Sequence, residues 1–367
     1  MTEYYVGLMS GTSMDGIDAV VASFENNAVQ LHATCSQAYP SDLRQALLSA
    51  IRLPLTAPLD VDGELHERVG QCFRDAALQV IKDSGVDRSS IRAIGSHGQT
   101  LRHQPAADPP FSLQVADADL IAAATGVTTV ANFRQADIKA GGQGAPLVPP
   151  FHEWLFHSKE QDRVVINIGG IANITVLPAS NADVSGFDTG PGNGLMDVWT
   201  QQHLGTAFDV DGAWAAGGSR LDGLLKLMLC DPYFALPPPK STGFEYFNPN
   251  WLARFDLQHF APQDVQTTLC ELTARTIVDA VRQHASRTQQ VFVCGGGIRN
   301  KTLMKRLCAL LGNCTVQSTA AAGLEPGWVE AAAFAWLAMR TMDGDSGNLP
   351  SVTGASHKVV LGDIHSP

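Results

Sequence analysis

The chain has 367 residues, of which 45% are hydrophobic and 17% are charged. This length exceeds what one hydrophobic core usually organises, so we expect at least two lobes. The formal net charge of -11 argues against a nucleic-acid partner, because phosphate-backbone binding needs clustered lysine and arginine. Apolar stretches are interrupted before the ~18 residues of a membrane span, and we expect no membrane partner.

Two further features concern the compartment. The first residues carry no basic segment followed by an apolar core, so we expect no secretion signal. The seven cysteines are dispersed, and none forms a Cys-x-x-Cys pair that would suggest zinc or redox chemistry. These features predict a cytoplasmic protein.

Strands and helices alternate along the first part of the chain, which is typical of helix-covered mixed or parallel sheets. Strands at residues 4–9 and 17–24 form an expected N-terminal hairpin, and apolar residues recur at helical spacing over 65–81. The next expected elements are a strand at 93–96, a helix that begins after Asp117 and ends near Gly126, and a strand at 127–131.

Residues 138–150 are rich in glycine and proline, and we place the boundary between the lobes there. The first lobe is expected to comprise residues 1–137 and about 348–367, and the second residues 138–347. The later part of the chain predicts helices at 151–156, 267–283, 303–311 and 328–340, and strands at 164–168 and 290–294. Residues 352–355 and 359–362 are predicted to be a turn and a strand that rejoin the first lobe.

A glycine-rich loop follows the first expected strand. Its small residues allow backbone N–H groups to approach a phosphate, and Thr12 and Ser13 add hydroxyl donors. The spacing of Gly11 and Gly16 resembles a P-loop, but Ile17 and Asp18 stand where that motif has Lys and Ser or Thr. The loop is therefore not a Walker motif.

Two similar turns follow the strands at 164–168 and 290–294. They occupy residues 167–173 and 294–300, and each contains consecutive glycines. A single turn of this kind is more often an ordinary tight turn. Three such turns at strand ends indicate a phosphate-binding protein.

In this order, the three turns resemble the phosphate-1, phosphate-2 and adenosine segments of the actin/hexokinase/Hsp70 ATPases. Five further segments resemble those of the anhydro-N-acetylmuramic acid kinases, in that family's order: residues 96–100, 141–146, 186–193, 239–243 and 350–355. The resemblance spans essentially the whole chain. It implies an α/β, two-lobed actin/hexokinase/Hsp70-like (ribonuclease H-like) fold, with nucleotide and sugar in the interlobe cleft.

The resemblance also implies the activity. Members of this family use ATP and water to open the 1,6-anhydro bridge of anhydro-N-acetylmuramic acid, giving N-acetylmuramic acid 6-phosphate in peptidoglycan recycling. It implies Mg²⁺ as cofactor and a homodimer as the assembly. The implied nucleotide contacts are Gly11, Thr12, Ser13, Met14, Asp15, Gly16, Ile17, Asp18, Gly169, Gly170, Asn173, Gly295, Gly296, Gly297 and Asn300.

Asp188 is the predicted catalytic residue. It precedes a Gly-Pro-Gly sequence at 190–192 that would aim it rigidly, and a carboxylate so placed can act as a general base. Without the resemblance, capping of the following turn is an equally good interpretation. With it, the implied role is to take a proton from the water that attacks the anomeric carbon.

Four other residues are predicted to bind the sugar: His97, Gln99, Arg134 and Glu330. Arg134 offers a planar fork that matches the lactyl carboxylate, although an ordinary surface ion pair is the alternative. Glu330 lies in an otherwise apolar helical stretch, where it either contacts sugar hydroxyls or merely benefits from the helix dipole. His97 with His103 could suggest a metal pair, but no third ligand is apparent.

Several assignments stay open. The family usually shows Asp-Phe-Arg-Arg-Arg where this chain has Asn132, Phe133, Arg134, Gln135 and Ala136, which leaves the roles of the neighbouring positions open. Asp15 or Asp18 could hold magnesium through water, and Lys240 could approach a phosphate or simply solvate its loop. Alternative functions are a related sugar or acyl kinase, a chaperone-like or cytoskeletal ATPase, and a catalytically silent sugar-binding regulator.

Overall fold

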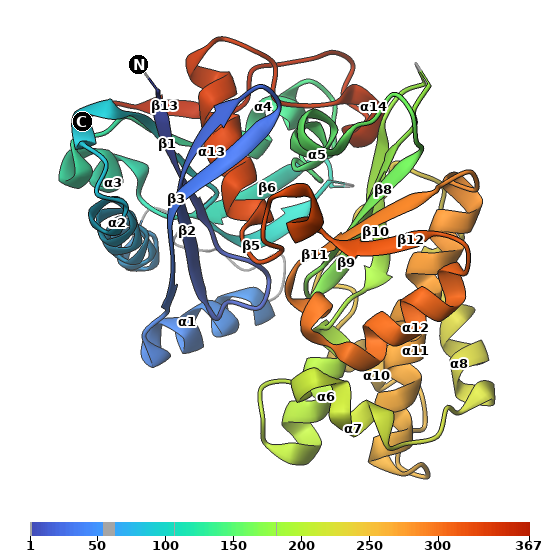
Figure 1. Ribbon diagram of the computed structural model, residues 1–367. Coiled ribbons are helices and arrows are strands. Elements are labelled where there is room, and N and C mark those ends of the chain that lie inside the picture. The colour runs from blue at the N-terminus through green and yellow to red at the C-terminus, as the bar shows by residue number, and fades with distance from the viewer. Residues whose placement is uncertain (1, 54–62, 106, 181) are drawn as a thin grey trace. The chain divides into compact units, whose positions relative to one another are not determined.

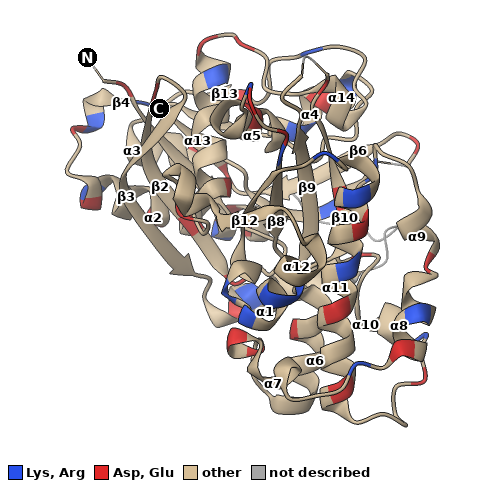
Figure 2. Ribbon diagram, turned by 45° about the vertical axis from the view of Figure 1, so that its right-hand side comes forward, with Lys and Arg blue, Asp and Glu red and all other residues tan. Residues whose placement is uncertain are grey.

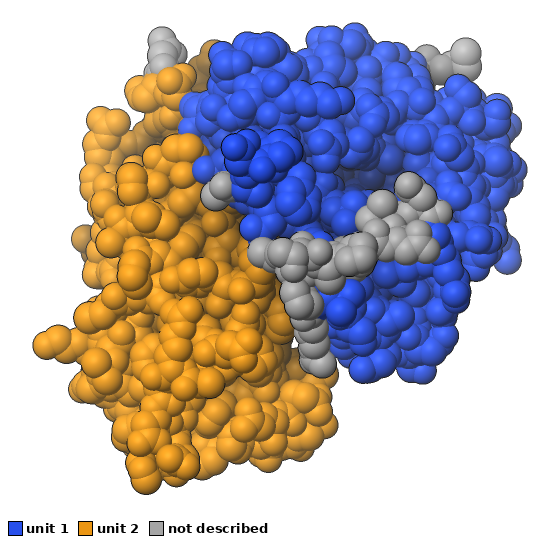
Figure 3. Space-filling model, turned by 180° about the vertical axis from the view of Figure 1, so that it is seen from behind, with its two compact units in different colours: residues 1–155, 328–367 blue, residues 156–327 orange. Residues whose placement is uncertain are grey.

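The computed structural model describes residues 2–53, 63–105, 107–180 and 182–367 (Figure 1). The chain divides into unit 1, residues 1–155 with 328–367, and unit 2, residues 156–327 (Figure 3). These boundaries differ from the expected ones after residues 137 and 347. The reason is that helices α5 (Pro149–Phe156) and α13 (Val329–Met342) pack on each other: the Trp336 ring lies 5.9 Å from Phe151 and 6.1 Å from Trp154.

Unit 1 is built on a six-stranded mixed sheet of order β13-β7-β4-β1-β2-β3. The central strand β1 runs antiparallel to β2 and parallel to β4, and β4 runs parallel to β7. A separate hairpin joins β5 and β6. The bounds are β1 Tyr4–Met9, β2 Gly16–Glu25, β3 Ala28–Ala38, β4 Ile91–Ser96, β5 Gln99–Gln104, β6 Phe111–Val115, β7 Thr129–Ala131 and β13 Asp363–His365.

Helices cover both faces of this sheet. Val6 and Leu8 of β1 share a core with α2 (Glu64–Ser84), while Gly7 between them faces α13. A Cβ atom on Gly7 would lie 1.8 Å from the Ala331 carbonyl oxygen, so only glycine lets α13 pack this closely. The remaining helices of the unit are α1 Ser41–Arg52, α3 Ala118–Thr125, α4 Phe133–Lys139, α14 Pro350–Thr353 and the 3₁₀ turn Arg88–Ser90.

Unit 2 repeats the topology of the five strands β3-β2-β1-β4-β7 of unit 1. Its order is β10-β9-β8-β11-β12, with β8 antiparallel to β9, β9 antiparallel to β10, and β11 parallel to both β8 and β12. The bounds are β8 Arg163–Ile168, β9 Ile171–Leu177, β10 Ser185–Pro191, β11 Gln290–Cys294 and β12 Thr315–Ser318. Each unit thus carries a three-strand antiparallel meander continued by two parallel strands. This duplicated α/β topology confirms the predicted fold class.

The long helix α11 organises the core of unit 2. Leu269, Leu272 and Ile277 of α11 pack with residues of β8, β9 and β11 and with Leu303 of α12. The helices of the unit are α6 Gly194–Leu204, α7 Ala213–Ala216, α8 Asp222–Leu229, α9 Pro232–Ala235, α10 Pro249–Leu252, α11 Pro262–His284 and α12 Lys301–Leu311. Short 3₁₀ turns lie at Val210–Gly212, Gly296–Arg299 and Thr319–Ala322.

Charged residues of both signs are distributed over these helices (Figure 2). One of them is buried: the Glu271 side chain of α11 is only 3% exposed. It accepts hydrogen bonds from Arg306 at 2.7 and 3.0 Å, from Arg275 at 3.0 Å and from Arg220 at 3.4 Å. Breaking this pairing would leave a buried charge uncompensated, so the cluster ties α11 to α12.

The C-terminal strand was predicted at the wrong place. Residues 359–362 are not a strand, and the last strand is β13, which pairs antiparallel with β7. Backbone groups of the predicted segment bond to side chains instead. The Val359 N–H donates to Asn348 Oδ1 at 2.8 Å, and the Leu361 carbonyl accepts from Thr341 Oγ1 at 2.5 Å. No helix in the described part of the chain is long and apolar enough to cross a membrane.

Candidate active site

Three segments of unit 2 meet where β8 and β11 end. These strands are parallel, so the glycine turns after them lie at the same edge of the sheet. A Cβ atom on Gly297 would lie 2.3 Å from Ile168 Cγ2. The Asn193 N–H donates to the Gly169 carbonyl at 2.8 Å, and the Gly192 N–H donates to the Gly170 carbonyl at 2.9 Å. The turn residues Gly169, Gly170, Gly295, Gly296 and Gly297 therefore lie in one small region.

The two asparagines predicted beside these turns have different settings. Asn300 caps helix α12, and its Oδ1 accepts from the Leu303 N–H at 2.9 Å. Asn173 lies inside strand β9 and not in the turn. Within the sheet it is paired with Asn167 of β8 on one side and with Asp188 of β10 on the other. The structure thus brings Asn173 next to the predicted base.

Asp188 is held in strand β10 with only 8% of its surface exposed. Its Oδ2 accepts a hydrogen bond from the Thr242 N–H at 2.9 Å. The backbone is held as well, because its N–H donates to the Lys240 carbonyl and its carbonyl accepts from Tyr233 Oη at 2.8 Å. These contacts fix the direction of the carboxylate.

The segment after Asp188 differs from the predicted turn. Strand β10 continues to Pro191, and its pairing with β9 shifts register between Asp188 and Gly190. Gly190 has a φ of +142° and packs against the Phe234 ring. The irregularity lies directly beside Asp188, and such bulges commonly re-aim a neighbouring side chain.

Lys240 points inward rather than into solvent. Its Nζ donates to the Tyr233 carbonyl at 3.2 Å and lies 4.7 Å from the centre of the Tyr233 ring. Burial lowers the pKa of the Lys240 amine, while the charge of Asp188 acts in the opposite direction. The interpretation that Lys240 solvates its loop is therefore wrong, and its cation lies near the predicted base.

In unit 1, the loop between β1 and β2 is held from two sides. Gln99 is fully buried, and its amide accepts from Ser10 Oγ at 2.7 Å and donates to the Gly11 carbonyl at 3.2 Å. From helix α1, Arg44 Nε donates to the Met14 carbonyl at 3.0 Å. Gln99 thus shapes this loop, and its predicted contact with a sugar stays a prediction.

The predicted nucleotide contacts in this loop fall into two groups. Thr12, Ser13 and Asp15 are exposed, while Gly11 and Gly16 are partly exposed. The side chains of Met14 and Ile17 belong to the core of unit 1, so only their backbone groups are available to a ligand.

Arg134 and His97 form a hydrogen-bonded pair in unit 1. Arg134 Nη2 donates to His97 Nε2 at 2.9 Å, and Nη1 donates to the Gly144 carbonyl at 2.8 Å. Burial, together with the Arg134 charge, lowers the pKa of His97 to about 3. The imidazole is therefore neutral near pH 7, which lets Nε2 accept from the guanidinium.

Glu330 lies on the same side of unit 1 as this pair. It occupies the first turn of α13, four residues before Phe334, so both side chains lie on one face of the helix. The Phe334 ring lies 4.6 Å from the His97 ring. Three of the four predicted sugar-binding residues, His97, Arg134 and Glu330, thus belong to neighbouring elements.

The candidate magnesium ligands are both hydrogen-bonded. Asp15 Oδ1 accepts from Ser13 Oγ at 2.7 Å, and Asp18 Oδ1 accepts from Ser36 Oγ. Among the described residues, no three His, Cys, Asp or Glu side chains gather as a metal site. One carboxylate at the β1–β2 loop fits an ion that is held mainly by phosphates and water.

Because of three buried histidines in unit 1, we expect the stability of the folded protein to depend on pH. Burial lowers the pKa of His97, His103 and His152 to about 3, against about 6.5 in an unfolded chain. Between these two pKa values the unfolded chain binds protons that the folded chain does not. The contribution of the three histidines to the free energy of unfolding is therefore complete above pH 6.5 and is lost as the pH falls below that value. We expect the free energy of unfolding to fall by up to about 1.4 kcal/mol per pH unit for each histidine.

Urea unfolding midpoints at about pH 7 and about pH 5.5 measure this effect. His152→Gln should reduce the difference between the two midpoints. His357→Gln should not, because the His357 side chain is exposed. Equal midpoint differences in both variants would contradict the assignment.

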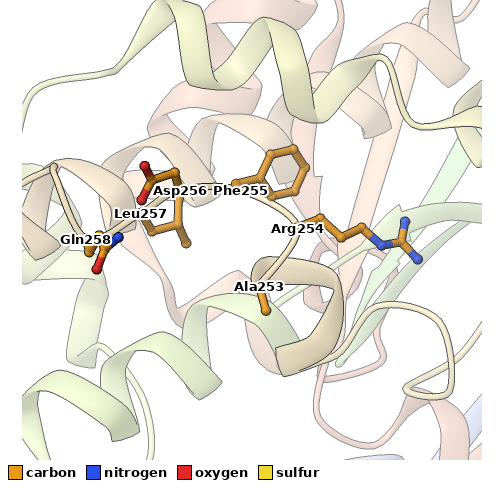
Figure 4. A pocket seen from close by; sticks show the side chains of 6 residues that line it. All are labelled: Ala253, Arg254, Phe255, Asp256, Leu257 and Gln258. Atoms are coloured by element: carbon orange, nitrogen blue, oxygen red, sulfur yellow. The ribbon is translucent and has the colours of Figure 1, made fainter.

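Unit 2 also has a surface hollow. It is lined by one continuous segment, Ala253, Arg254, Phe255, Asp256, Leu257 and Gln258 (Figure 4). Arg254 Nη1 is paired with Asp231 at 3.2 Å, and Asp256 with His259 at 3.2 Å. None of the predicted site residues lines this hollow, and we assign it no role in the reaction.

Comparison with known proteins decides the family. The sequence pattern of the anhydro-N-acetylmuramic acid kinases matches residues 3–367. The anhydro-N-acetylmuramic acid kinase of Xanthomonas campestris pv. campestris (strain 8004) is 50% identical over 98% of this chain and 97% of its own length. This chain belongs to the anhydro-N-acetylmuramic acid kinase family.

A second relative is the anhydro-N-acetylmuramic acid kinase of Shewanella halifaxensis. It is 49% identical over 99% of this chain and 98% of its own length. Among solved structures, the (R)-2-hydroxyglutaryl-CoA dehydratase component A of Acidaminococcus fermentans is similar. The likeness covers 93% of this chain and 100% of that protein's chain. Its sequence identity is 10% and its TM-score is 0.48.

Two departures from the anhydro-N-acetylmuramic acid kinase pattern have structural roles. Asn132 has a φ of +58°, a conformation that asparagine tolerates better than most residues, and its Nδ2 donates to Asp363 at 2.6 Å. Gln135 Nε2 donates to the Ser112 carbonyl at 2.8 Å. Both side chains tie the first turn of helix α4 to other segments of unit 1 and add no further cations.

The supporting residues of the site were not found from the sequence. Thr242 and Tyr233 contact Asp188 from segments 54 and 45 residues away. Arg44 reaches the first glycine loop from helix α1. The only sequence signal for any of them is that Thr242 lies in the segment 239–243, which resembles the anhydro-N-acetylmuramic acid kinases.

Proposed function

We propose that this chain is an ATP-dependent sugar kinase that hydrolytically opens 1,6-anhydro-N-acetylmuramic acid and phosphorylates O6. The products are N-acetylmuramic acid 6-phosphate and ADP, as expected in peptidoglycan recycling. Membership of the family supports the substrate. The observation that carries the mechanism is the buried Asp188 carboxylate, which is oriented by the Thr242 N–H.

Asp188 acts as the general base. It accepts a proton from a water molecule whose oxygen bonds to the anomeric carbon, while the bond from that carbon to O6 breaks and O6 takes the γ-phosphoryl group of ATP. An inverting glycosidase normally needs a second carboxyl group to protonate the leaving oxygen. Here the phosphoryl group captures that oxygen, so one carboxylate is enough.

The remaining residues bind and orient the substrates. Arg134, held by His97 and Gly144, presents its guanidinium to the lactyl carboxylate, and Glu330 and His97 contact sugar hydroxyls. The glycine turns at 169–170 and 295–297 and the β1–β2 loop bind ATP through backbone N–H groups. Mg²⁺, held through Asp15 or Asp18 with water, would neutralise phosphate charge.

The location and assembly are further proposals. In the described part of the chain, the seven cysteines form no disulfide, which suits a reducing cytoplasm. The homodimer implied by family resemblance stays a prediction. A related sugar or acyl kinase is the alternative function, and it would share the ATP-binding turns but not the need for Arg134.

The reaction of the purified protein with ATP, Mg²⁺ and the anhydro sugar tests the proposal. We expect one ADP for each sugar 6-phosphate formed, and no ADP when glucose or acetate replaces the sugar. Turnover of glucose or acetate without turnover of the anhydro sugar would favour the related kinases. ATP hydrolysis that needs no acceptor would favour a chaperone-like ATPase.

A further inference from the structure

Asp137 is a fully buried carboxylate that joins three segments of unit 1. Its Oδ2 accepts from the Gly144 N–H at 2.8 Å. Its Oδ1 accepts from Asn348 Nδ2 at 2.8 Å and from Thr353 Oγ1 at 2.7 Å. Through these bonds helix α4 is tied to residues 141–146 and to residues 348–353.

The glycine-rich segment 141–146 is shaped around this carboxylate. A Cβ atom on Gly142 would lie 2.2 Å from Asp137 Oδ2, so only glycine allows the close approach. Gly144 has a φ of +68°, a left-handed conformation that favours glycine. The Gln143 N–H in addition donates to the Thr353 carbonyl at 2.8 Å. The segments 141–146 and 350–355, which the proposed reaction steps do not use, thus meet at Asp137.

The backbone of Gly144 links Asp137 to Arg134. Its N–H is held by Asp137, and its carbonyl accepts from Arg134 Nη1 at 2.8 Å. The second guanidinium nitrogen, Nη2, is held by His97 at 2.9 Å. Since two acceptors fix the plane of the guanidinium, a shift of the Gly144 backbone would turn Arg134 away from its ligand.

We propose that Asp137 is a positioning residue for the substrate carboxylate: it holds the N–H of Gly144, and the carbonyl of the same residue in turn aims Arg134. This inference rests on the proposed function, in which Arg134 binds the lactyl carboxylate. It assigns Asp137 an effect on sugar affinity that the general stability of unit 1 does not explain.

The variant Asp137→Asn separates these effects. Its single acceptor oxygen can serve Asn348 and Thr353, but the amide nitrogen cannot accept from the Gly144 N–H. We expect KM for the sugar to rise about tenfold or more, with kcat and KM for ATP changed less than about threefold.

Thr353→Val is the matched control. It removes one bond to Asp137 Oδ1 and leaves the Gly144 bond in place. We expect it to lower the unfolding temperature while KM for the sugar changes less than about threefold. An equal rise of sugar KM in both variants, or a parallel rise of KM for ATP in Asp137→Asn, would overturn the proposal.

A substrate without the lactyl group distinguishes this failure from failure of the proposed function. With 1,6-anhydro-N-acetylglucosamine, Asp137→Asn should change KM less than about twofold, since Arg134 has no carboxylate to bind. The same fold-change for both sugars would overturn the positioning role. If the wild-type protein turns over neither sugar, the proposed function itself is wrong.

Hydrogen exchange tests the link without changing Asp137. In Arg134→Ala, the Gly144 carbonyl loses its donor, and we expect faster amide exchange confined to residues 141–146. Arg68→Ala, on helix α2, should leave this segment unchanged. Unchanged exchange of residues 141–146 in Arg134→Ala would overturn the proposal even if Asp137→Asn fails to fold.

Discussion

Asp188→Asn is expected to lower kcat by about 10²–10⁴-fold or more, because an amide cannot accept the proton that the attacking water releases. The architecture of the site should survive. The amide oxygen can still accept from the Thr242 N–H, and the bonds to Tyr233 and Lys240 involve only the backbone of residue 188. The ground state is therefore preserved and the transition state is destabilised.

A steady-state assay of ADP release and a calorimetric titration with the sugar measure both quantities on the same variant. The dissociation constant for the sugar should change less than about threefold. Asp183→Asn is the control, because Asp183 is exposed and lies just before strand β10. If sugar binding vanished together with activity, Asp188 would be a binding residue, and a loss of turnover below about tenfold would place the base elsewhere.

Arg134→Ala should weaken sugar binding by about 10- to 150-fold, which corresponds to the ~1.5–3 kcal/mol of a hydrogen bond to a charged group. The variant removes the guanidinium that His97 and Gly144 hold in place. ATP affinity should stay within about threefold, since the loss is confined to the carboxylate of the sugar.

Calorimetric titrations with the sugar and with a non-hydrolysable ATP analogue give the comparison. Arg68→Ala, which removes a surface ion pair with Asp42, is the control and should change neither affinity. A similar loss for both ligands in Arg134→Ala would refute the role of Arg134 as a carboxylate ligand.

The elements that were predicted closely carry their own boundary signals. Helix α3 begins where Asp117 caps the Leu120 N–H at 2.9 Å, and it ends at Gly126, which has a φ of +66°. Strands β1 and β11 were predicted at their observed bounds, since both are short apolar runs that a glycine-rich turn ends. In these cases local chemistry determines the structure.

The errors of the prediction have different causes. Strand β3 pairs with the preceding strand β2, and its apolar and polar residues alternate over residues 29–36, so this alternation could have predicted the strand. Residues 359–362 were predicted to form a strand, but the side chains of Asn348 and Thr341 form hydrogen bonds with their backbone groups. Propensity alone could not reveal these competing bonds.

In the candidate site, single residues could be predicted from local motifs, but the partners that orient them could not. Asp188 and Arg134 were proposed from their motifs, and the structure places each in a network that orients it. The networks themselves, with Thr242, Tyr233 and Asp137, come from segments whose meeting no local pattern predicts. Glu330 was assigned to the second lobe, whereas α13 packs on the sheet of unit 1 because Gly7 permits the contact.

The most direct test of the account is the reaction in oxygen-18 water, followed by mass spectrometry of the sugar phosphate. If Asp188 activates a water that attacks the anomeric carbon, each product molecule should carry one labelled oxygen at that carbon, and the transferred phosphoryl group should carry none. Label found only in phosphate would show that water attacks ATP instead. That result, or the absence of a sugar phosphate, would contradict the proposed mechanism.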